Sequence, residues 1–289
     1  MTADPAMKET DQYLETFERF ETQAKQPAWI YPLRKAGIAR FAELGFPTLQ
    51  QEDWRFTNVA PIAKLPFRPV FQVSRDGLTP EAVAGFTFGK LAANRLVFVD
   101  GHYAAELSAL GPLPQGVIVS SLVTALASDT GLIKAHLAQH AQGEGDAFSA
   151  LNAAFFQDGG FVYVPAGKQG EVPIHLLYIS TAKEAGAAAH PRNLIIAEKA
   201  SKVTVLESYV SVAEASYITN AVTDLVLGEG AAVEHVKFQD EGRNAFHIAA
   251  VHAYLGGNCN FISHSIATGA RLSRNNIRTA LAGEGWSAS

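Results

Sequence analysis

The sequence predicts a mainly β protein with an N-terminal α-helical region, and its strands favour a β-solenoid over an antiparallel sandwich or barrel. Three observations predict this fold class. Apolar residues follow a helical period within the first 60 residues, short β runs fill almost all of the chain after Gly159, and no 12-residue helical pattern separates those runs. The last observation excludes a Rossmann-like alternation of strands and helices.

Length and composition limit the possible functions. The chain has 289 residues, which allows about two domains. Its 23 Lys and Arg against 28 Asp and Glu give a net charge of −5, so there is no global reason to expect nucleic acid or an anionic membrane as a partner. The single cysteine, Cys259, is typical of the reducing cytoplasm, and no apolar run reaches the length of a membrane span. We therefore expect a cytoplasmic protein.

Two amphipathic helices are expected near the N-terminus, over residues 11–23 and 32–44, because apolar side chains recur there at helical spacing. Pro32 suits a first helical position, and Gly45 suits the left-handed residue just past a helix end. Pro47 then prevents the second helix from resuming.

Residues 59–90 are rich in proline and phenylalanine, which predicts an irregular linker that packs aromatic side chains. The period changes at a short β run over residues 95–99. We therefore expect residues 1–90 to form an N-terminal helical domain with its linker, and residues 91–289 to form the β core.

After two further helical pieces, the β core reads as a series of strands separated by turn residues. Turns are expected at Gly167, at His190-Pro191, at Gly230 and at Asn258. The strand runs are residues 161–164, 174–179, 193–197, 202–210, 217–227, 232–238, 247–255 and 260–266.

Three details favour the solenoid over the sandwich. Many strands mix polar and apolar residues instead of alternating, as residues 217–224 do, and the turns are not of the two-residue hairpin type. No exact repeat of fixed period is present, so both architectures stay open on the residues alone. Small residues also dominate the expected inward positions, as a narrow coil requires: Ala221, Ala231, Ala232, Ala249 and Ala250.

Four side chains of the strand region are candidate metal ligands. His235, His247 and His264 lie in successive strands, and Cys259 lies near the last of them. Neighbouring coils of a solenoid approach within about 4.8 Å, and imidazole and thiolate groups bind soft or borderline metals. A free-standing metal-binding module is therefore one alternative function. The other interpretation is that the histidines are hydrogen-bonded corner or surface residues and Cys259 is a small buried hydrophobe.

Enzymatic motifs are weak or missing in the sequence. It contains no G-x-S-x-G elbow, so we expect no catalysis by a nucleophilic serine of that type. It also contains no P-loop, so we expect no nucleotide hydrolysis. Glycoside cleavage, which is common on β-solenoids, needs two carboxylates some 5–10 Å apart. The acids of the strand region are scattered, and Asp240-Glu241-Gly242 predicts a solvated turn. A carbohydrate-active enzyme stays an alternative, but we expect no enzymatic activity.

Two longer stretches of the sequence are more distinctive than the patterns described above. Residues 45–58 read G-F-P-T-L-Q-Q-E-D-W-R-F-T-N, and residues 151–165 read L-N-A-A-F-F-Q-D-G-G-F-V-Y-V-P. Both resemble motifs of the SufB/SufD family, the scaffold proteins of the SUF iron–sulfur cluster assembly system. His190-Pro191-Arg192 together with Glu207 also match the pattern. The long helical N-terminal region is similar to the SufD branch of the family.

This resemblance implies a right-handed parallel β-helix and a non-enzymatic scaffold or accessory subunit. Such a subunit pairs with SufB through the β-helices and acts with the SufC ATPase, and a homodimer through the β-helix is a further expectation. No cofactor is expected to be firmly bound, although iron or an iron–sulfur cluster could pass through the complex transiently.

The resemblance also implies that this chain is C-terminally truncated, because members of the family continue with more coils and C-terminal helices. Residues 286–289 read W-S-A-S and fit the family pattern poorly. We hypothesise that a frameshift produced them.

Overall fold

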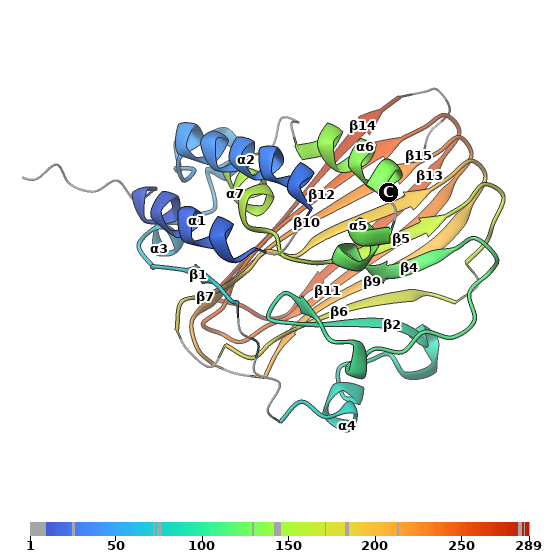
Figure 1. Ribbon diagram of the computed structural model, residues 1–289, viewed down its shortest axis with the longest axis horizontal. Helices are drawn as coiled ribbons and strands as arrows, with labels where there is room; N and C mark the ends of the chain where they lie inside the picture. Colours follow the sequence, from blue (N-terminus) through green and yellow to red (C-terminus); the bar gives the residue numbers. More distant parts are fainter. Residues whose placement is uncertain are drawn as a thin grey trace, which may run out of the picture.

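The computed structural model describes residues 10–288 except 25–26, 72, 74–76, 129, 142–145, 171, 183–184, 213, 283–284 and 286. Trp286 and Ser289, on which the frameshift hypothesis rests, lie outside this part of the chain. The fold is mostly β, with helices in the N-terminal part and a parallel β-solenoid behind them, which confirms the predicted fold class (Figure 1). Among the described helices, none is long and apolar enough to cross a membrane.

Seven α-helices are found in the described part of the chain, all before the main run of strands. Helices α1, α2 and α7 lie together beside one end of the strands (Figure 1). The helices are α1 (Asp11–Gln23), α2 (Tyr31–Leu44), α3 (Ala60–Ala63), α4 (Pro80–Ala84), α5 (Leu122–Ser128), α6 (Thr130–Ala141) and α7 (Ala147–Phe155).

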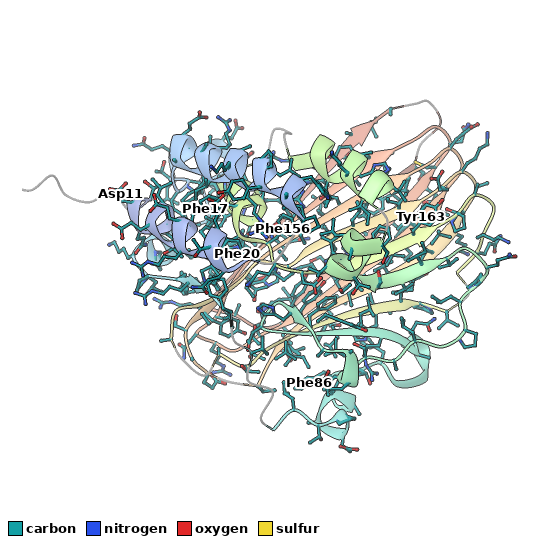
Figure 2. All side chains as sticks on the ribbon, viewed as in Figure 1. Asp11, Phe17, Phe20, Phe86, Phe156 and Tyr163 are labelled. Atoms are coloured by element: carbon teal, nitrogen blue, oxygen red, sulfur yellow. The ribbon has the colours of Figure 1, made fainter. Side chains whose placement is uncertain are left out.

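The helical layer is held together around a buried arginine. Arg34 of α2 is 2% exposed and donates hydrogen bonds to the carbonyl oxygens of Ala154 (3.3 Å) and Phe156 (2.7 Å) at the end of α7. Its guanidinium also stacks over the rings of Phe20 and Phe156, which lie near Phe17 in this layer (Figure 2). Burial lowers the pKa of Arg34 to about 10, so the group stays charged at neutral pH.

The solenoid consists of two sheets, and from β8 to β14 successive strands alternate between them, so that each coil contributes to both. The first sheet contains β1 (Arg68–Pro69), β4 (Ile118–Ser121), β5 (Gly160–Val164), β7 (Ala187–Ala189), β8 (Arg192–Ala197), β10 (Tyr217–Leu227), β12 (Phe246–Leu255) and β14 (Leu272–Leu281). The second sheet contains β2 (Asn94–Val99), β3 (His102–Tyr103), β6 (Ile174–Ser180), β9 (Lys202–Ser211), β11 (Ala232–Asp240), β13 (Asn260–Ala267) and β15 (Ser287–Ala288).

The strands of successive coils pair in parallel, and this pairing excludes the antiparallel sandwich. Val203 of β9 pairs with Val233 of β11, and Val233 pairs with Phe261 of β13. One coil therefore takes 30 residues (203 to 233) and the next takes 28 (233 to 261). Because the coil length varies, the sequence shows no repeat of fixed period.

One corner of the solenoid turns through a left-handed residue in every coil. Gly167 (φ +70°), Ala200 (φ +53°), Gly230 (φ +68°), Asn258 (φ +54°) and Gly285 (φ +69°) occupy this corner in turn. The turns at Gly167, Gly230 and Asn258 were predicted from their residue types, since glycine and asparagine tolerate positive φ. The turn at Ala200 was not, because alanine gives no such signal.

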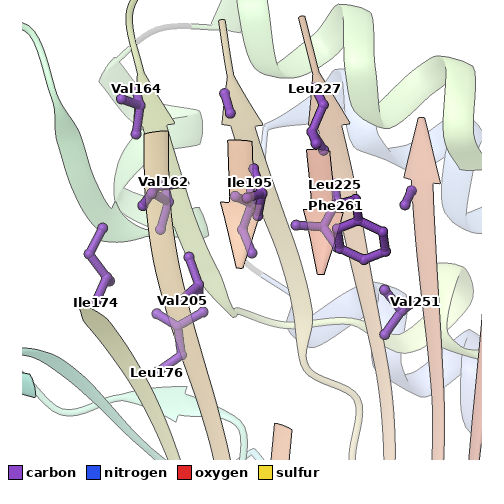
Figure 3. Packing of buried hydrophobic residues seen from close by; sticks show 14 of the residues in the cluster. Val162, Val164, Ile174, Leu176, Ile195, Val205, Leu225, Leu227, Val251 and Phe261 are labelled. Atoms are coloured by element: carbon purple, nitrogen blue, oxygen red, sulfur yellow. The ribbon is translucent and has the colours of Figure 1, made fainter. Parts of the chain in front are cut away.

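The lumen, which is the space between the two sheets, is apolar at the corner end (Figure 3). Val162, Ile195 and Leu225 of the first sheet pack in one cluster with Val205 and Phe261 of the second. Strand alternation places every second side chain in this cluster.

Some inward and strand assignments from the sequence were wrong. Ala221, Ala231 and Ala249 belong to the lumen cluster as predicted, whereas Ala232 and Ala250 alternate to the outer faces. Strand β14 was not predicted, because its sequence L-S-R-N-N-I-R-T-A-L is polar and has little alternation.

We expect Gly37→Ala to lower the melting temperature, because α2 and α7 cross closely at this residue. A Cβ on Gly37 would lie 2.8 Å from both the carbonyl oxygen of Ala150 and the backbone nitrogen of Ala154. Overpacking of this kind costs about 1–3 kcal/mol, against a gain in helix propensity of about 1 kcal/mol. Gly85→Ala, whose Cβ would meet nothing nearer than 3.4 Å, is the control. Equal melting temperatures for the two variants in circular dichroism would contradict the expectation.

Candidate functional site

A buried polar cluster occupies the lumen beyond its apolar end. Its members alternate with outward side chains along the strands, so the same period that builds the core also brings them together. The polar cluster consists of Tyr178, Asn193, Glu207, Tyr209, Thr219, Thr223, His235, Lys237, Gln239, Glu241 and His247, all of them buried.

Glu207 is the acceptor at the centre of this cluster. It accepts hydrogen bonds from Thr223 (2.7 Å) and Tyr209 (2.8 Å), and its Oε1 lies 3.1 Å from Nε2 of His235. Burial acts to raise the pKa of Glu207, but the interactions with His235, Thr223 and Tyr209 outweigh burial and lower it. Glu207 is therefore a buried carboxylate at neutral pH.

A second carboxylate, Glu241, is held in the same way. Its Oε2 lies 2.7 Å from Nδ1 of His247, and it accepts hydrogen bonds from Thr219 (2.6 Å) and Gln239 (3.1 Å). Burial opposes ionisation, yet attraction to His247 and these hydrogen bonds lower the pKa of Glu241. Burial, followed by the nearby charge of Lys237, lowers the pKa of His247 below 6.5.

Lys237 brings a positive charge to the two carboxylates. Its Nζ lies 5.4 Å from the centre of the Tyr209 ring, and the side chain is 2% exposed. Burial lowers the pKa of Lys237 to about 8, while Glu207 and Glu241 act in the opposite direction. The lysine therefore offsets one of two buried negative charges at neutral pH.

One chain of hydrogen bonds connects successive coils through the cluster. The Tyr178 hydroxyl donates to Oδ1 of Asn193, and the Asn193 amide donates to Thr223 (3.1 Å), which donates to Glu207. On the far side of Glu207, Nδ1 of His235 lies 3.4 Å from the hydroxyl of Ser263 on β13. These hydrogen bonds satisfy Asn193, Thr223 and Glu207 across the coils, while Nε2 of His247 and Oε1 of Gln239 have no hydrogen-bond partner in the structure.

The four predicted metal ligands do not form one set. His235 and His247 lie in the polar cluster, whereas His264 is exposed on the outer face of β13 and Cys259 is buried in the apolar part of the lumen. Within the described residues, no group of three or more His, Cys, Asp or Glu is arranged to hold a metal ion. The assignment of a metal to these residues stays a prediction.

The three acids that a glycosidase could use lie in three separate parts of the solenoid. Asp224 lies on the outer face of the first sheet, where it accepts a hydrogen bond from Arg192 (2.7 Å). Glu234 is exposed on the second sheet. The expectation of a solvated turn at Glu241 was wrong, because this residue is 4% exposed and belongs to the polar cluster. Sequence reasoning also missed Lys237, although it has the same strand parity as His235.

The motif residues of the sequence analysis fasten the helical layer to the solenoid. Asn152 of α7 donates hydrogen bonds to the carbonyl oxygens of Pro191 (2.9 Å) and Asn220 (2.8 Å). Trp54 packs on Phe148 of the same helix with ring centres 5.4 Å apart. Because Trp54 also packs in a buried cluster with strand residues of the first sheet, both motifs dock the helical layer onto the solenoid.

Fold and motif positions define a class of protein, the parallel β-solenoids with a helical N-terminal region. The chain matches the SufBD protein N-terminal region over residues 7–176, and the SufBD core domain of the SUF FeS cluster assembly system over residues 178–289. It belongs to the SufBD family of iron–sulfur cluster assembly proteins, as its motifs predicted.

Individual relatives agree with this assignment. An iron–sulfur cluster assembly SufBD family protein of Synechocystis is 28% identical over 253 residues, which cover 85% of this chain and 55% of the relative. The iron–sulfur cluster assembly protein SufD of Bacillus subtilis is 26% identical (81% and 53% covered), and that of Escherichia coli is 25% identical (88% and 56% covered). The chain spans about half the length of these curated relatives.

We expect wild type to lose stability relative to His247→Gln as the pH falls from 7 to 5. The folded-state pKa of His247 is lowered below its usual 6.5, so the unfolded chain binds the proton first and folding weakens in this range. Burial raises the pKa of Asp158 to about 6, so protonation of Asp158 stabilises the folded state as the pH falls. This effect is the same in both proteins. Urea unfolding at stepwise pH measures the difference, and a constant difference would contradict the expectation.

We expect Glu207→Leu to destabilise the solenoid severely. Thr223, Tyr209 and His235 would lose their common acceptor, and each buried unsatisfied group costs about 1–3 kcal/mol. Glu207→Gln keeps an acceptor and should lie between this variant and wild type. The control is Glu234→Leu, on an exposed face. The urea concentration at the midpoint of unfolding measures the stability of each variant. Similar midpoints for Glu207→Leu and Glu234→Leu would mean that the polar cluster does not stabilise the fold.

Proposed function

We propose that this chain is a SufD-type scaffold subunit of iron–sulfur cluster assembly, which pairs with SufB and acts with the SufC ATPase. In this proposal the subunit is cytoplasmic and contributes surface rather than catalysis. Membership of the SufBD family and the relatives named SufD support the proposal.

The observation that carries the pairing is the stacking of the coils, which β13 and β14 continue. Strands of the first sheet pair in parallel and in register from coil to coil, and β14 continues this pairing from β12. Ile277 (44% exposed) and Leu281 (46% exposed) stand in register with the lumen residues Val251 and Leu255. In-register strands around an apolar lumen are a template that the strands of another solenoid can continue. A second solenoid with a similar cross-section suits it.

Iron or a cluster enters this proposal as cargo of the complex. Of the four predicted ligands, His264 has an exposed side chain, and it lies on the last described coil. Imidazole is a suitable ligand for iron. We propose that His264 meets such cargo at the subunit boundary, while the histidines of the polar cluster serve the fold.

Co-expression with SufB and SufC from the same genome tests the proposal. We expect tagged wild-type chain to retain SufB, and Ile277→Lys to lose it, because a lysine would put a charge into the buried interface. Ile118→Lys is a matched control, since Ile118 is 45% exposed on β4, at the opposite end of the same sheet.

Light scattering on the purified chain separates the homodimer from the proposed pair. Retention of SufB by wild type and Ile118→Lys, but not by Ile277→Lys, supports the proposal. Failure of wild type to retain SufB would contradict it, and a stable dimer of this chain that excludes SufB would replace SufB with a second copy as the partner.

A further inference from the structure

Three neighbouring side chains of the polar cluster carry polar atoms that have no hydrogen-bond partner. Lys237 is 2% exposed, and within the described residues no atom accepts a hydrogen bond from its Nζ, although the charges of Glu207 and Glu241 act on it. Among the same residues, Nε2 of His247 and Oε1 of Gln239 are buried and have no partner. Burying a polar group is costly unless it is hydrogen-bonded, so these three groups together indicate a bound molecule.

The three groups gather beside one face of the Tyr209 ring. Nζ of Lys237 lies 5.4 Å from the centre of that ring, and the centre of the His247 ring lies 4.8 Å from it. Gln239 pairs in register with Tyr209 on the next strand of the second sheet. Tyr178, from the preceding coil, stacks on the other face of the ring. The unpartnered atoms therefore share the space on the far side of Tyr209.

Small side chains cover this space from the next coil. Ser265 and Ala267 of β13 and Ser273 of β14 follow the three groups in register. Inward side chains of neighbouring coils lie directly against one another. Serine and alanine fill less of the lumen than the aromatic ladder does on the other side of Tyr209, and this leaves room for a small molecule.

The donors and acceptors of the three groups specify which molecule fits. Nδ1 of His247 lies 2.7 Å from the Glu241 carboxylate, which can only accept, so the neutral imidazole carries its proton on Nδ1 and has a lone pair on Nε2. The amide nitrogen of Gln239 donates to the same carboxylate, which leaves Oε1 as a second acceptor. The Lys237 ammonium can only donate.

Neither an anion nor a metal ion satisfies this set. An anion would accept from Lys237 but would be repelled by the two acceptors, and a metal ion would suit the two acceptors but would be repelled by the ammonium. A water molecule accepts a hydrogen bond from the lysine and donates one to each acceptor. Three hydrogen bonds are typical of a buried water molecule.

We propose that a water molecule binds in the lumen between Lys237, Gln239 and His247 and completes the hydrogen bonding of the polar cluster. Lys237 and Gln239 belong to β11 of the second sheet and His247 belongs to β12 of the first, so the water bridges the two sheets across the lumen. All three side chains belong to this chain, so the water site needs no partner subunit.

A crystal structure of the full chain, at a resolution that shows ordered water, tests the site directly. We expect one density peak within about 2.7–3.2 Å of Lys237 Nζ, Gln239 Oε1 and His247 Nε2. A soak in bromide should give no anomalous peak at this position. An anomalous peak there would identify an anion and overturn the proposal. A structure in which Nζ bonds directly to Glu207 or Glu241, with no density between the three atoms, would overturn it as well.

Magnetic relaxation dispersion of water oxygen-17 and deuterium measures the residence time of internal water in solution. We expect Lys237→Met and Gln239→Met each to shorten the residence time of one internal water roughly tenfold, because each removes one of its three hydrogen bonds. Gln239→Met leaves the charges of the cluster unchanged, so it decides the outcome if Lys237→Met does not fold.

Ser263→Ala is the matched control. The Ser263 hydroxyl lies 3.4 Å from Nδ1 of His235, which contacts Glu207 rather than the three unpartnered groups. We expect this variant to keep the residence time of wild type. Equal residence times in wild type, Lys237→Met and Gln239→Met would overturn the proposal, as would an equal loss in Ser263→Ala.

Discussion

In-register parallel pairing of successive coils is the constraint on which the rest of the structure depends. It places each inward side chain directly against the inward side chains of the coils before and after it. Phe98, Tyr178 and Tyr209 form a stacked ladder for this reason, with ring centres 4.7 Å and 4.9 Å apart. The same register pairs Glu207 with Lys237, so a buried acid meets a buried base.

This register makes the polar cluster consistent with the fold despite the cost of burying charge. A slip of one residue would turn Lys237 to the outer face and leave Glu207 in the lumen without a cation. The carboxylate, its lysine and the hydrogen bonds from Thr223 and Tyr209 are satisfied together only in the observed pairing. The polar cluster therefore opposes slippage between coils, which an apolar lumen alone would oppose less strongly.

The helical layer gives the solenoid its asymmetry. Asn152 and Trp54 fasten helices and loop to the first sheet, and Arg274 links that loop to β14. One outer face of the first sheet is thereby covered, while the second sheet has no such layer of α-helices among the described residues.

The sequence by itself determined the class of fold, most strand positions, three of the corner turns and the family. These features depend on local chemistry, such as the apolar runs of β10 or the tolerance of Gly230 for positive φ. Only the tertiary structure decided which polar residues meet. Coil lengths of 28 and 30 residues set the register, and no local pattern encodes them. Glu241, which follows the last residue of β11, therefore looked like a surface residue, but the turn into β12 places His247 against it inside the lumen.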